Sequence, residues 1–117
     1  MKDYSSSIDK LPKMTELLEE NIDEFNKMVD NNNPPDMRNK NLSSLDLRKA
    51  KLKGLDLSGC YFRNANLKGI DLTGCSLHGA SIHNATISGV LFPENLPVEE
   101  ILMSVNYGTR MRVFPKD

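Results

Sequence analysis

The middle of this chain repeats with a period of five residues, and that period limits the possible folds more than any other feature. From residue 42 to residue 92 a large apolar residue occupies every fifth position. These residues are Leu42, Leu47, Leu52, Leu57, Phe62, Leu67, Leu72, Leu77, Ile82, Ile87 and Phe92. Two positions before each, from residue 45 onward, stands a small or apolar residue, and glycine or asparagine stands two positions after most of them. The α-helix repeats every 3.6 residues and the β-strand every 2, so a period of five requires a turn inside each unit.

Four such units can close a square coil. Glycine and asparagine tolerate the backbone conformations that tight turns need. A short extended segment and a corner in each unit give a coil of about 20 residues, and successive coils stack at about 4.8 Å, like neighbouring strands. Both apolar columns then point inward and leave no internal space for a ligand. The sequence therefore predicts a mainly β fold, a quadrilateral parallel β-helix of fewer than three coils.

The units resemble those of the pentapeptide-repeat family, whose pattern is A(D/N)LxX. They read LDLRK, AKLKG, LDLSG, CYFRN, ANLKG, IDLTG, CSLHG, ASIHN, ATISG and VLFPE. The resemblance covers residues 40–94 and implies that the coil is right-handed. It also implies a non-catalytic interaction module, or a relative of the members that inhibit or protect DNA gyrase by imitating duplex DNA.

Composition and charge divide the chain into three segments. Residues 1–36 form an acidic helical segment that ends in an Asn/Pro hinge, residues 37–94 form the β-helix, and residues 95–117 form a capping helix and tail. The first segment has nine acidic and four basic residues, the second has four acidic and eight basic, and the third has three of each. The formal net charge of −1 thus results from an acidic N-terminal segment and a basic middle segment whose charges nearly cancel. We expect the two to meet, within one molecule or between two.

Helices are predicted at both ends of the coil, because an open coil edge would expose unpaired backbone groups. A single N-terminal helix over residues 11–30 has apolar residues seven apart, such as Leu18 and Phe25, and an acidic opposite face. A C-terminal capping helix begins at Pro97 and ends near Tyr107. The second helix should seat on the last coil, whereas the first could cap the first coil or pair with its copy in a homodimer.

Outward side chains twenty residues apart should lie above one another on the faces of the coil. This register places Arg48 next to Lys68, and like charges so close raise the energy unless an anion or a partner relieves them. It also places Lys51 next to Asp71, which is the favourable version of the same geometry.

The repeat contains no arrangement of residues suited to catalysis. Asp46, Asp56 and Asp71 fall on different faces, so turn hydrogen bonds suit them better than paired acid–base work. No nucleophile and base converge, and the glycines are corner residues rather than a phosphate-binding loop before a helix. We therefore expect that the protein is not an enzyme and uses no cofactor.

Cysteine and histidine are the remaining candidates for metal or redox chemistry. Cys60 and Cys75 belong to the inward column of small residues, where we expect buried, inert thiols. His78 and His83 point outward on different faces, as ordinary surface histidines. We therefore predict no metal site.

Nothing in the sequence indicates export or a membrane. No apolar run approaches the roughly 20 residues that cross a bilayer, and the start MKDYSSSIDK lacks the apolar core of a secretory signal. Two cysteines do not make a disulfide scaffold. We expect a cytoplasmic protein with no membrane contact.

The interpretation that best fits these features is a non-catalytic protein–protein interaction module that inhibits or adapts a protein partner. Its flat faces would present side chains in a regular grid. The candidate partner-binding residues are Arg48, Tyr61, Arg63, Lys68 and His83 on the β-helix, and Glu16, Glu20 and Glu24 on the first helix. Met111, Val113 and Phe114, expected to be exposed after the second helix, are a second candidate surface or a clasp onto a second copy.

Two other functions stay open at this point. The acidic helix could make the protein a DNA-mimic modulator of a DNA-binding enzyme such as gyrase, although the β-helix itself is basic and short. The basic faces could instead bind nucleic acid through its phosphates, although only Tyr61 supplies an aromatic ring for stacking on bases.

Overall fold

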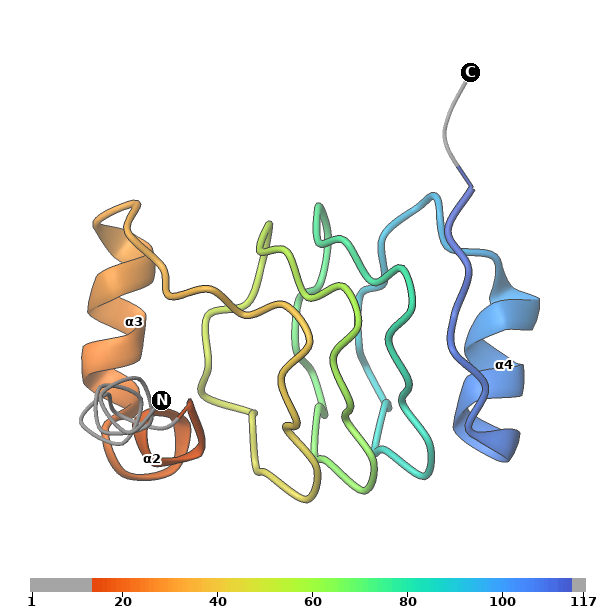
Figure 1. Cartoon of the computed structure of the whole chain (residues 1–117), viewed down its shortest axis with the longest axis horizontal. Coiled ribbons are helices and arrows are strands. Elements are labelled where there is room, and N and C mark those ends of the chain that lie inside the picture. Colours follow the sequence, from red (N-terminus) through yellow and green to blue (C-terminus); the bar gives the residue numbers. More distant parts are fainter. Residues whose placement is uncertain (1–13, 115–117) are drawn as a thin grey trace, which may run out of the picture.

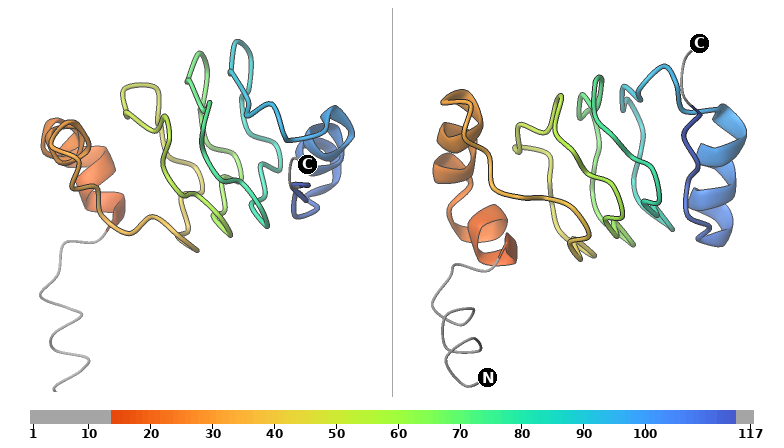
Figure 2. Two further views of the ribbon diagram at one scale, coloured as in Figure 1. Left: turned by 90° about the horizontal axis from the view of Figure 1, so that it is seen from above. Right: turned by 45° about the horizontal axis from the view of Figure 1, so that its top comes forward.

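The computed structural model describes residues 14–114 of the chain. Three helices flank a stack of coils: α2 (Met14–Glu20), α3 (Ile22–Asp30) and α4 (Val98–Tyr107). Figures 1 and 2 show α2 and α3 at one end of the stack and α4 at the other. None of the helices in this range has the length and apolar character needed to cross a membrane.

The coils are held together by parallel β-bridges between residues twenty apart. The bridges join Asn41 to Tyr61, Asp46 to Asn66, Asp56 to Ser76, Tyr61 to Ser81, Asn66 to Thr86 and Asp71 to Leu91. The middle coil bonds to the coils on both sides: the Phe62 N–H donates to Ser81 O at 2.8 Å, and the Asn66 N–H donates to Leu45 O at 2.8 Å. Four pentapeptides therefore make one coil of a parallel β-helix, as the period of five predicts.

The two inward columns form the core. The large residues from Leu42 to Ile82 are almost completely buried, and the small residues Ala65 and Ala80 beside them are fully buried. Ile87 and Phe92, on the last sides of the stack, are only partly buried. The reason is positional, because no further coil covers this end of the two columns.

The corners depend on left-handed backbone and on a side-chain hydrogen bond. Gly54 (φ +76°) and Gly74 (φ +74°) stack so closely that a Cβ on Gly74 would lie 3.5 Å from the Gly54 Cα. In several of the units, an outward Asp or Asn accepts a hydrogen bond from the N–H two residues on, as Asp71 Oδ1 does from Thr73 at 2.9 Å. Ser44 adopts the same left-handed conformation (φ +64°), although the sequence argument assigned the corners to glycine and asparagine only.

The N-terminal segment is two helices, so the prediction of one helix over residues 11–30 is wrong in its middle; residues 11–13 lie outside the described residues. Asn21 (φ −130°, ψ 47°) interrupts the helical backbone between α2 and α3. Its carbonyl still accepts the Phe25 N–H at 3.1 Å, which starts α3. The turn allows Leu18 from α2 and Phe25 from α3 both to be buried.

Helix α3 lies against the first coil and covers part of its edge. The Asn26 side chain donates from Nδ2 to Lys49 O at 3.0 Å and accepts from the Lys51 N–H at 2.9 Å. In the regular coils such an N–H bonds to the preceding coil, as the Tyr61 N–H does to Lys40 O at 2.9 Å. The Asn26 amide thus replaces the backbone of a missing coil.

An ion pair supports the same contact and corrects the sequence prediction for Lys51. The Lys51 Nζ lies 2.9 Å from both carboxylate oxygens of Asp30 at the end of α3, not beside Asp71. Asp71 instead has Lys53 Nζ at 4.0 Å. The helix cap attracts Lys51 because it brings Asp30 close to the coil, which the repeat pattern alone could not show.

The C-terminal end of the stack is covered by α4 and by the segment after it. Helix α4 is capped at its C-terminus by Gly108 (φ +77°), and the chain then returns across the last coil. Met111 accepts the Gly79 N–H at 2.7 Å and donates to Ala80 O at 2.8 Å, as a residue of a further coil would. From α4, the Ser104 Oγ accepts the Ile82 N–H at 2.9 Å.

This return segment corrects the prediction of an exposed apolar tail. Met111 is fully buried and Val113 is packed against the core, because both lie on the last coil. Phe114 remains exposed. The segment is held further by Glu100, which is almost fully buried and lies 2.7 Å from the Arg112 guanidinium.

Replacing Leu67 with aspartate tests the inward column. Leu67 is fully buried, and an unpaired carboxylate in its place carries a desolvation cost of several kcal/mol. We expect Leu67→Asp to abolish cooperative unfolding in circular dichroism. Ser88→Asp, at an exposed outward position of the same side, should unfold like the wild type. A cooperative melt of Leu67→Asp near the wild-type temperature would contradict the inward assignment.

Replacing Asn26 with alanine tests the helix cap. The change removes two hydrogen bonds to the first coil, each worth about 1 kcal/mol. We expect Asn26→Ala to lower the free energy of unfolding in urea by about 1–2 kcal/mol. Lys27→Ala, at the exposed neighbouring position, is the control and should change stability by less than about 0.5 kcal/mol. Equal stabilities of the two variants would show that the amide does not hold the edge.

Candidate partner-binding surface

The eight candidate residues lie in two groups. The β-helix carries Tyr61, Arg63 and His83 on one side of the coil, and Arg48 and Lys68 on the next side. Glu16, Glu20 and Glu24 lie on the helices at the N-terminal end. The structure therefore places the β-helix candidates on two neighbouring sides of the coil and the acidic candidates on the helices at its N-terminal end.

Tyr61, Arg63 and His83 are neighbours because of the twenty-residue register. The bridge between Tyr61 and Ser81 aligns the two coils, and the Asn64 N–H donates to His83 O at 2.9 Å. Arg63 thus lies one coil from His83 and two residues from Tyr61. We call the surface formed by Tyr61, Arg63, His83 and the adjoining Arg110 the Tyr61 face.

Arg110 is a member of this face that sequence reasoning missed. Its guanidinium carbon lies 4.8 Å from the centre of the Tyr61 ring, and its Nη1 donates to Gly79 O at 3.2 Å. The cation and the ring stabilise each other, and Tyr61 keeps 39% of its surface exposed. No repeat signal could have found Arg110, since it comes from the return segment after α4.

Both histidines lie next to the C-terminal cap; His78 is an exposed surface histidine as predicted, whereas His83 is partly buried. His83 is half-buried against Gly108, where an added Cβ would meet the ring Cγ at 3.3 Å. Its Nδ1 is buried and has no hydrogen-bond partner within the described range. His78 is exposed, and its Nδ1 accepts the Val113 N–H at 3.2 Å. His83 therefore contributes a partly buried ring to the Tyr61 face rather than an exposed imidazole.

Arg48 forms an ion pair with Asp46, two residues earlier in the same repeat unit. Its guanidinium donates from Nε to Asp46 Oδ1 at 2.8 Å and from Nη2 to Oδ2 at 2.7 Å. These bonds lower the pKa of Asp46 to about 2 and raise the pKa of Arg48. Asp46 thus offsets the charge of Arg48 and reduces the predicted repulsion between Arg48 and Lys68.

Arg63 and Lys68 are the uncompensated cations of this region. Both are exposed, and neither is in an ion pair in the structure of residues 14–114. Lys49, on the same side of the coil as Lys68, is also exposed and unpaired within that range. The outward residues stacked around Arg63 are uncharged: Asn41, Ser43, Asn64, Ser81 and Asn84. A positive surface without internal neutralisation therefore runs across two sides of the coil.

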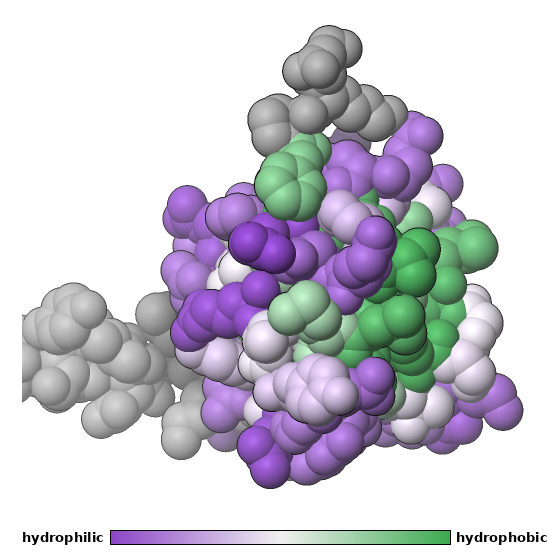
Figure 3. Space-filling view, turned by 90° about the vertical axis from the view of Figure 1, so that its right-hand side faces the viewer, coloured by the Kyte–Doolittle hydropathy of each residue, from purple (hydrophilic) through white to green (hydrophobic). Residues whose placement is uncertain are grey.

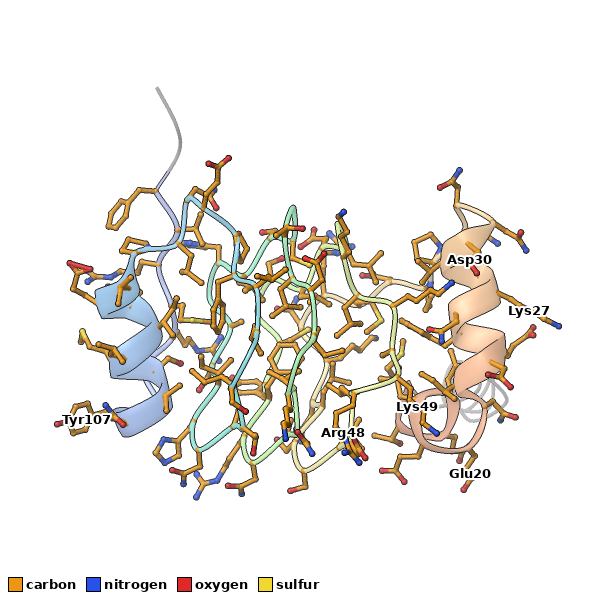
Figure 4. All side chains as sticks on the ribbon, turned by 180° about the vertical axis from the view of Figure 1, so that it is seen from behind. Glu20, Lys27, Asp30, Arg48, Lys49 and Tyr107 are labelled. Atoms are coloured by element: carbon orange, nitrogen blue, oxygen red, sulfur yellow. The ribbon has the colours of Figure 1, made fainter. Side chains whose placement is uncertain are left out.

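The acidic candidates do not form one continuous strip. Glu16, Glu20 and Glu24 are all exposed, and their spacing of four would align them along an unbroken helix. The interruption at Asn21 leaves Glu16 and Glu20 on α2 and Glu24 on α3, which run in different directions (Figure 1). Figure 4 shows Glu20 near the side of the stack that carries Lys49.

The two cysteines are buried core residues. Cys60 and Cys75 are buried, and each Sγ contacts a backbone carbonyl, Met37 O at 2.8 Å and Leu52 O at 3.0 Å. Burial raises the pKa of both thiols, which disfavours the reactive thiolate. Within residues 14–114, no three His, Cys, Asp or Glu side chains are placed to hold a metal ion.

Comparison with known proteins identifies the repeat. The family model described as "Pentapeptide repeats" matches the chain in eight copies, over residues 35–64 and 56–92. These residues include the β-helix and all five of its candidate contact residues. No curated protein and no solved structure matches the chain.

The Asp46–Arg48 pair leads to a prediction about acid stability. Because the pKa of Asp46 is lowered to about 2 in the folded protein, its stabilising effect is complete above its unfolded pKa of about 3.9 and is lost as the pH falls towards 2. Both side chains are more than half exposed, so the effect is small. We expect Asp46→Asn to melt at nearly the wild-type temperature at pH 7 and to lose less stability between pH 4 and pH 2.

The turn itself should survive this change. Asn66 occupies the same position one coil on, and its Oδ1 accepts the Lys68 N–H at 3.1 Å. The melting temperature measured across the pH range checks the prediction. An acid sensitivity equal to that of the wild type would mean that Asp46 does not contribute to it.

Proposed function

Because residues 35–92 place this chain in the pentapeptide-repeat family, we propose that it is a non-catalytic module that binds a protein partner through the Tyr61 face and Lys68. Proteins of this family are generally structural or interaction modules rather than enzymes. Inhibition of the partner, or its connection to other components, would be the consequence of such binding.

The observation that carries the proposal is the pair of exposed cations, Arg63 and Lys68, on a rigid ladder. Their backbone is hydrogen-bonded within the stack: Arg63 O accepts the Ser44 N–H at 2.8 Å, and the Lys68 N–H donates to Asn66 Oδ1 at 3.1 Å. A rigid backbone reduces the conformational entropy lost on binding. Two charges without internal partners favour an acidic surface on the other protein.

The Tyr61–Arg110 pair supports the same location. Tyrosine and arginine are the residue types that most often carry binding energy at protein interfaces. Tyr61 is partly exposed beneath the Arg110 guanidinium, so a partner can contact ring and cation together. We propose that Arg63 and Lys68 orient the partner and that Tyr61 and Arg110 contribute most of the apolar contact.

The other functions have less support. A DNA mimic needs carboxylates in a regular, continuous array, and the interruption at Asn21 separates Glu24 from Glu16 and Glu20. Binding of single-stranded nucleic acid needs several exposed aromatic rings, and the Tyr61 face has only Tyr61 and the partly buried His83. Glu16, Glu20 and Glu24 remain candidates for a separate contact in this proposal.

The proposal includes three further elements that follow from the family resemblance and the composition. The coil is right-handed, the protein acts in the cytoplasm, and it works as a homodimer. The homodimer would present two copies of the Tyr61 face to one partner or to two.

The proposal is tested by reversing the two charges. The tagged wild type is first used to capture its partner from a lysate of its source, and the affinity of the purified partner is then measured by calorimetry. We expect Arg63→Glu with Lys68→Glu to weaken binding by at least tenfold. Both positions are exposed, so the double variant should fold like the wild type by circular dichroism.

A matched control is Lys27→Glu with Lys53→Glu, which makes the same change in net charge away from the Tyr61 face. It should bind the partner nearly as well as the wild type. Equal losses in both double variants would indicate general electrostatic attraction, and no loss in either would remove the face from the proposal. Recovery of nucleic acid alone, with an affinity that falls steeply with salt, would contradict protein binding.

A further inference from the structure

One stretch of the ladder between the first and second coils lacks its backbone hydrogen bonds. The ladder is intact on both sides of it: the Leu47 N–H donates to Asn66 O, and the Gly54 N–H donates to Thr73 O, each at 3.0 Å. Between these points the register predicts three further bonds, and none of them is formed in the structure of residues 14–114. The missing pairs are the Lys49 N–H with Lys68 O, the Asp71 N–H with Ala50 O, and the Leu52 N–H with Asp71 O. The equivalent bonds between the second and third coils are all formed, at 2.8 to 3.0 Å.

The interruption begins at the corner residue Lys49. Corner residues recur every five positions from Asn39 to Gly89, and the others all have a positive φ, between +56° and +79°. The φ of Lys49 is negative. Asparagine and serine can offset the cost of left-handed backbone with a short polar side chain, which lysine lacks. The chain therefore turns differently at Lys49, and the residues that follow do not pair with the second coil.

Helix α3 holds the same stretch of the first coil from its other side. The Asn26 side chain bonds to Lys49 O and to the Lys51 N–H, and Asp30 lies 2.9 Å from the Lys51 Nζ. In Figure 1 this part of the first coil leans toward α3. We call the gap that it leaves, between residues 49–52 and the second coil, the Lys49 opening.

The Lys49 opening contains a pocket and unpaired backbone groups. The pocket has a volume of about 380 Å³, within the range of ligand sites. It is lined by Val29, Ala50, Lys51, Leu52, Lys53 and Asp71. The three missing bonds leave three N–H and three C=O groups, with both kinds on each coil. An extended peptide also carries donors and acceptors in alternation, so its backbone can pair with these groups as an added strand does.

The charges around the Lys49 opening favour an acidic segment. Lys49 and Lys68 are exposed, and neither is in an ion pair within residues 14–114. The other two lysines of the opening each face one aspartate, at 2.9 Å and 4.0 Å. Two positive charges thus remain. Because alternate side chains of an extended chain point to opposite sides, acidic residues can face the lysines while apolar residues face the pocket.

A phosphate backbone fits the Lys49 opening less well than a peptide. Phosphate oxygens accept hydrogen bonds but donate none, so they would leave the carbonyl groups of Lys68, Ala50 and Asp71 unpaired. Buried polar groups without partners raise the free energy of a complex. The mixed set of donors and acceptors therefore separates the two kinds of ligand, although both carry negative charge.

We propose that the Lys49 opening binds an extended acidic segment of the partner protein, whose backbone occupies the interrupted ladder. This inference rests on the proposed function and deepens it, because Lys68 belongs to both surfaces and the segment gives the partner a stated chemistry. The exposed apolar side chains of α4 lie at the other end of the molecule (Figures 1 and 3) and take no part in this contact.

The first test is amide hydrogen exchange of the full chain, measured by NMR. The unpaired amides of Leu52 and Asp71 should exchange roughly a hundredfold faster than that of Leu47. Lys49→Gly should slow both to the rate of Leu47, because glycine permits the left-handed corner. Asn64→Gly is the matched control and should change nothing, since Asn64 already has φ +61°. Slow exchange in the wild type, or fast exchange in Lys49→Gly, would overturn the proposal.

The second test is the binding of a synthetic probe, a capped hexapeptide in which valine and glutamate alternate. Its addition should shift the NMR signals of the Leu52 and Asp71 amides and slow their exchange. Lys49→Gly should weaken the binding by about tenfold or more, because the closed ladder no longer offers its backbone groups. Lys49→Gln removes the charge but not the negative φ, and should weaken the binding by no more than about fivefold. Equal affinities of wild type and Lys49→Gly would contradict the proposal.

Two altered peptides separate the backbone contribution from the charge. The same peptide with N-methylated amides cannot donate to the ladder and should not bind. The peptide with lysine in place of glutamate should not bind either. Equal binding of all three peptides would contradict recognition of an extended acidic chain, as would binding of single-stranded oligothymidylate but of no peptide.

These outcomes are separable from those of the proposed function. Lys49→Gly leaves Arg63 and Lys68 in place, and Arg63→Glu with Lys68→Glu should leave the exchange of the Leu52 amide unchanged. If Lys49→Gly binds the captured partner as tightly as the wild type, this inference fails and the proposed function stands. If Lys49→Gly loses affinity for the partner and the double variant does not, the Lys49 opening is supported and the Tyr61 face is removed.

Discussion

The twenty-residue register of the backbone ladder is the constraint on which the rest of the molecule depends. Every inward column, every corner and every outward row exists because residue i lies beside residue i + 20, as in the bridge from Asp46 to Asn66. The register in turn depends on leucine-sized side chains filling the axis and on left-handed corners that let the chain turn within five residues. Shifting one coil by a single residue would bring polar groups into the core, so the apolar columns and the hydrogen bonds enforce the same pairing.

The same constraint explains which charges are available to a partner. Four of the five described ion pairs follow from local geometry. In two of them a carboxylate binds a cation two residues on in the sequence. In the third the two residues lie on neighbouring coils, and in the fourth the carboxylate comes from helix α3. Arg63 has no such neighbour, because Tyr61 stands where Arg48 has Asp46. Lys68 has Asn66 there. The free cations are therefore a consequence of the residue two positions earlier, which is uncharged in both.

Sequence reasoning reached the coil, its register and its inward columns because a five-residue period is a local, repeated signal. It failed where the repeat ends. The interruption at Asn21, the pairing of Lys51 with Asp30, and the burial of Met111 all arise from contacts between a cap and a coil, for which one chain offers a single example and no period. Arg110 was missed for the same reason. His83 was placed on the correct side of the coil, but its partial burial depends on Gly108, which follows another helix.

The two caps pair with the backbone edges at the ends of the stack, through the Asn26 amide at one end and the Met111 backbone at the other. The number of coils between them is therefore free to change without altering either cap. Each added pentapeptide would rotate the C-terminal helix by a quarter turn about the stack relative to the N-terminal helices, and four would restore the original angle at greater length. The number of repeats thus sets the angle about the stack between helix α4 and the N-terminal helices that carry the acidic residues. Gain or loss of four units at a time leaves this angle unchanged.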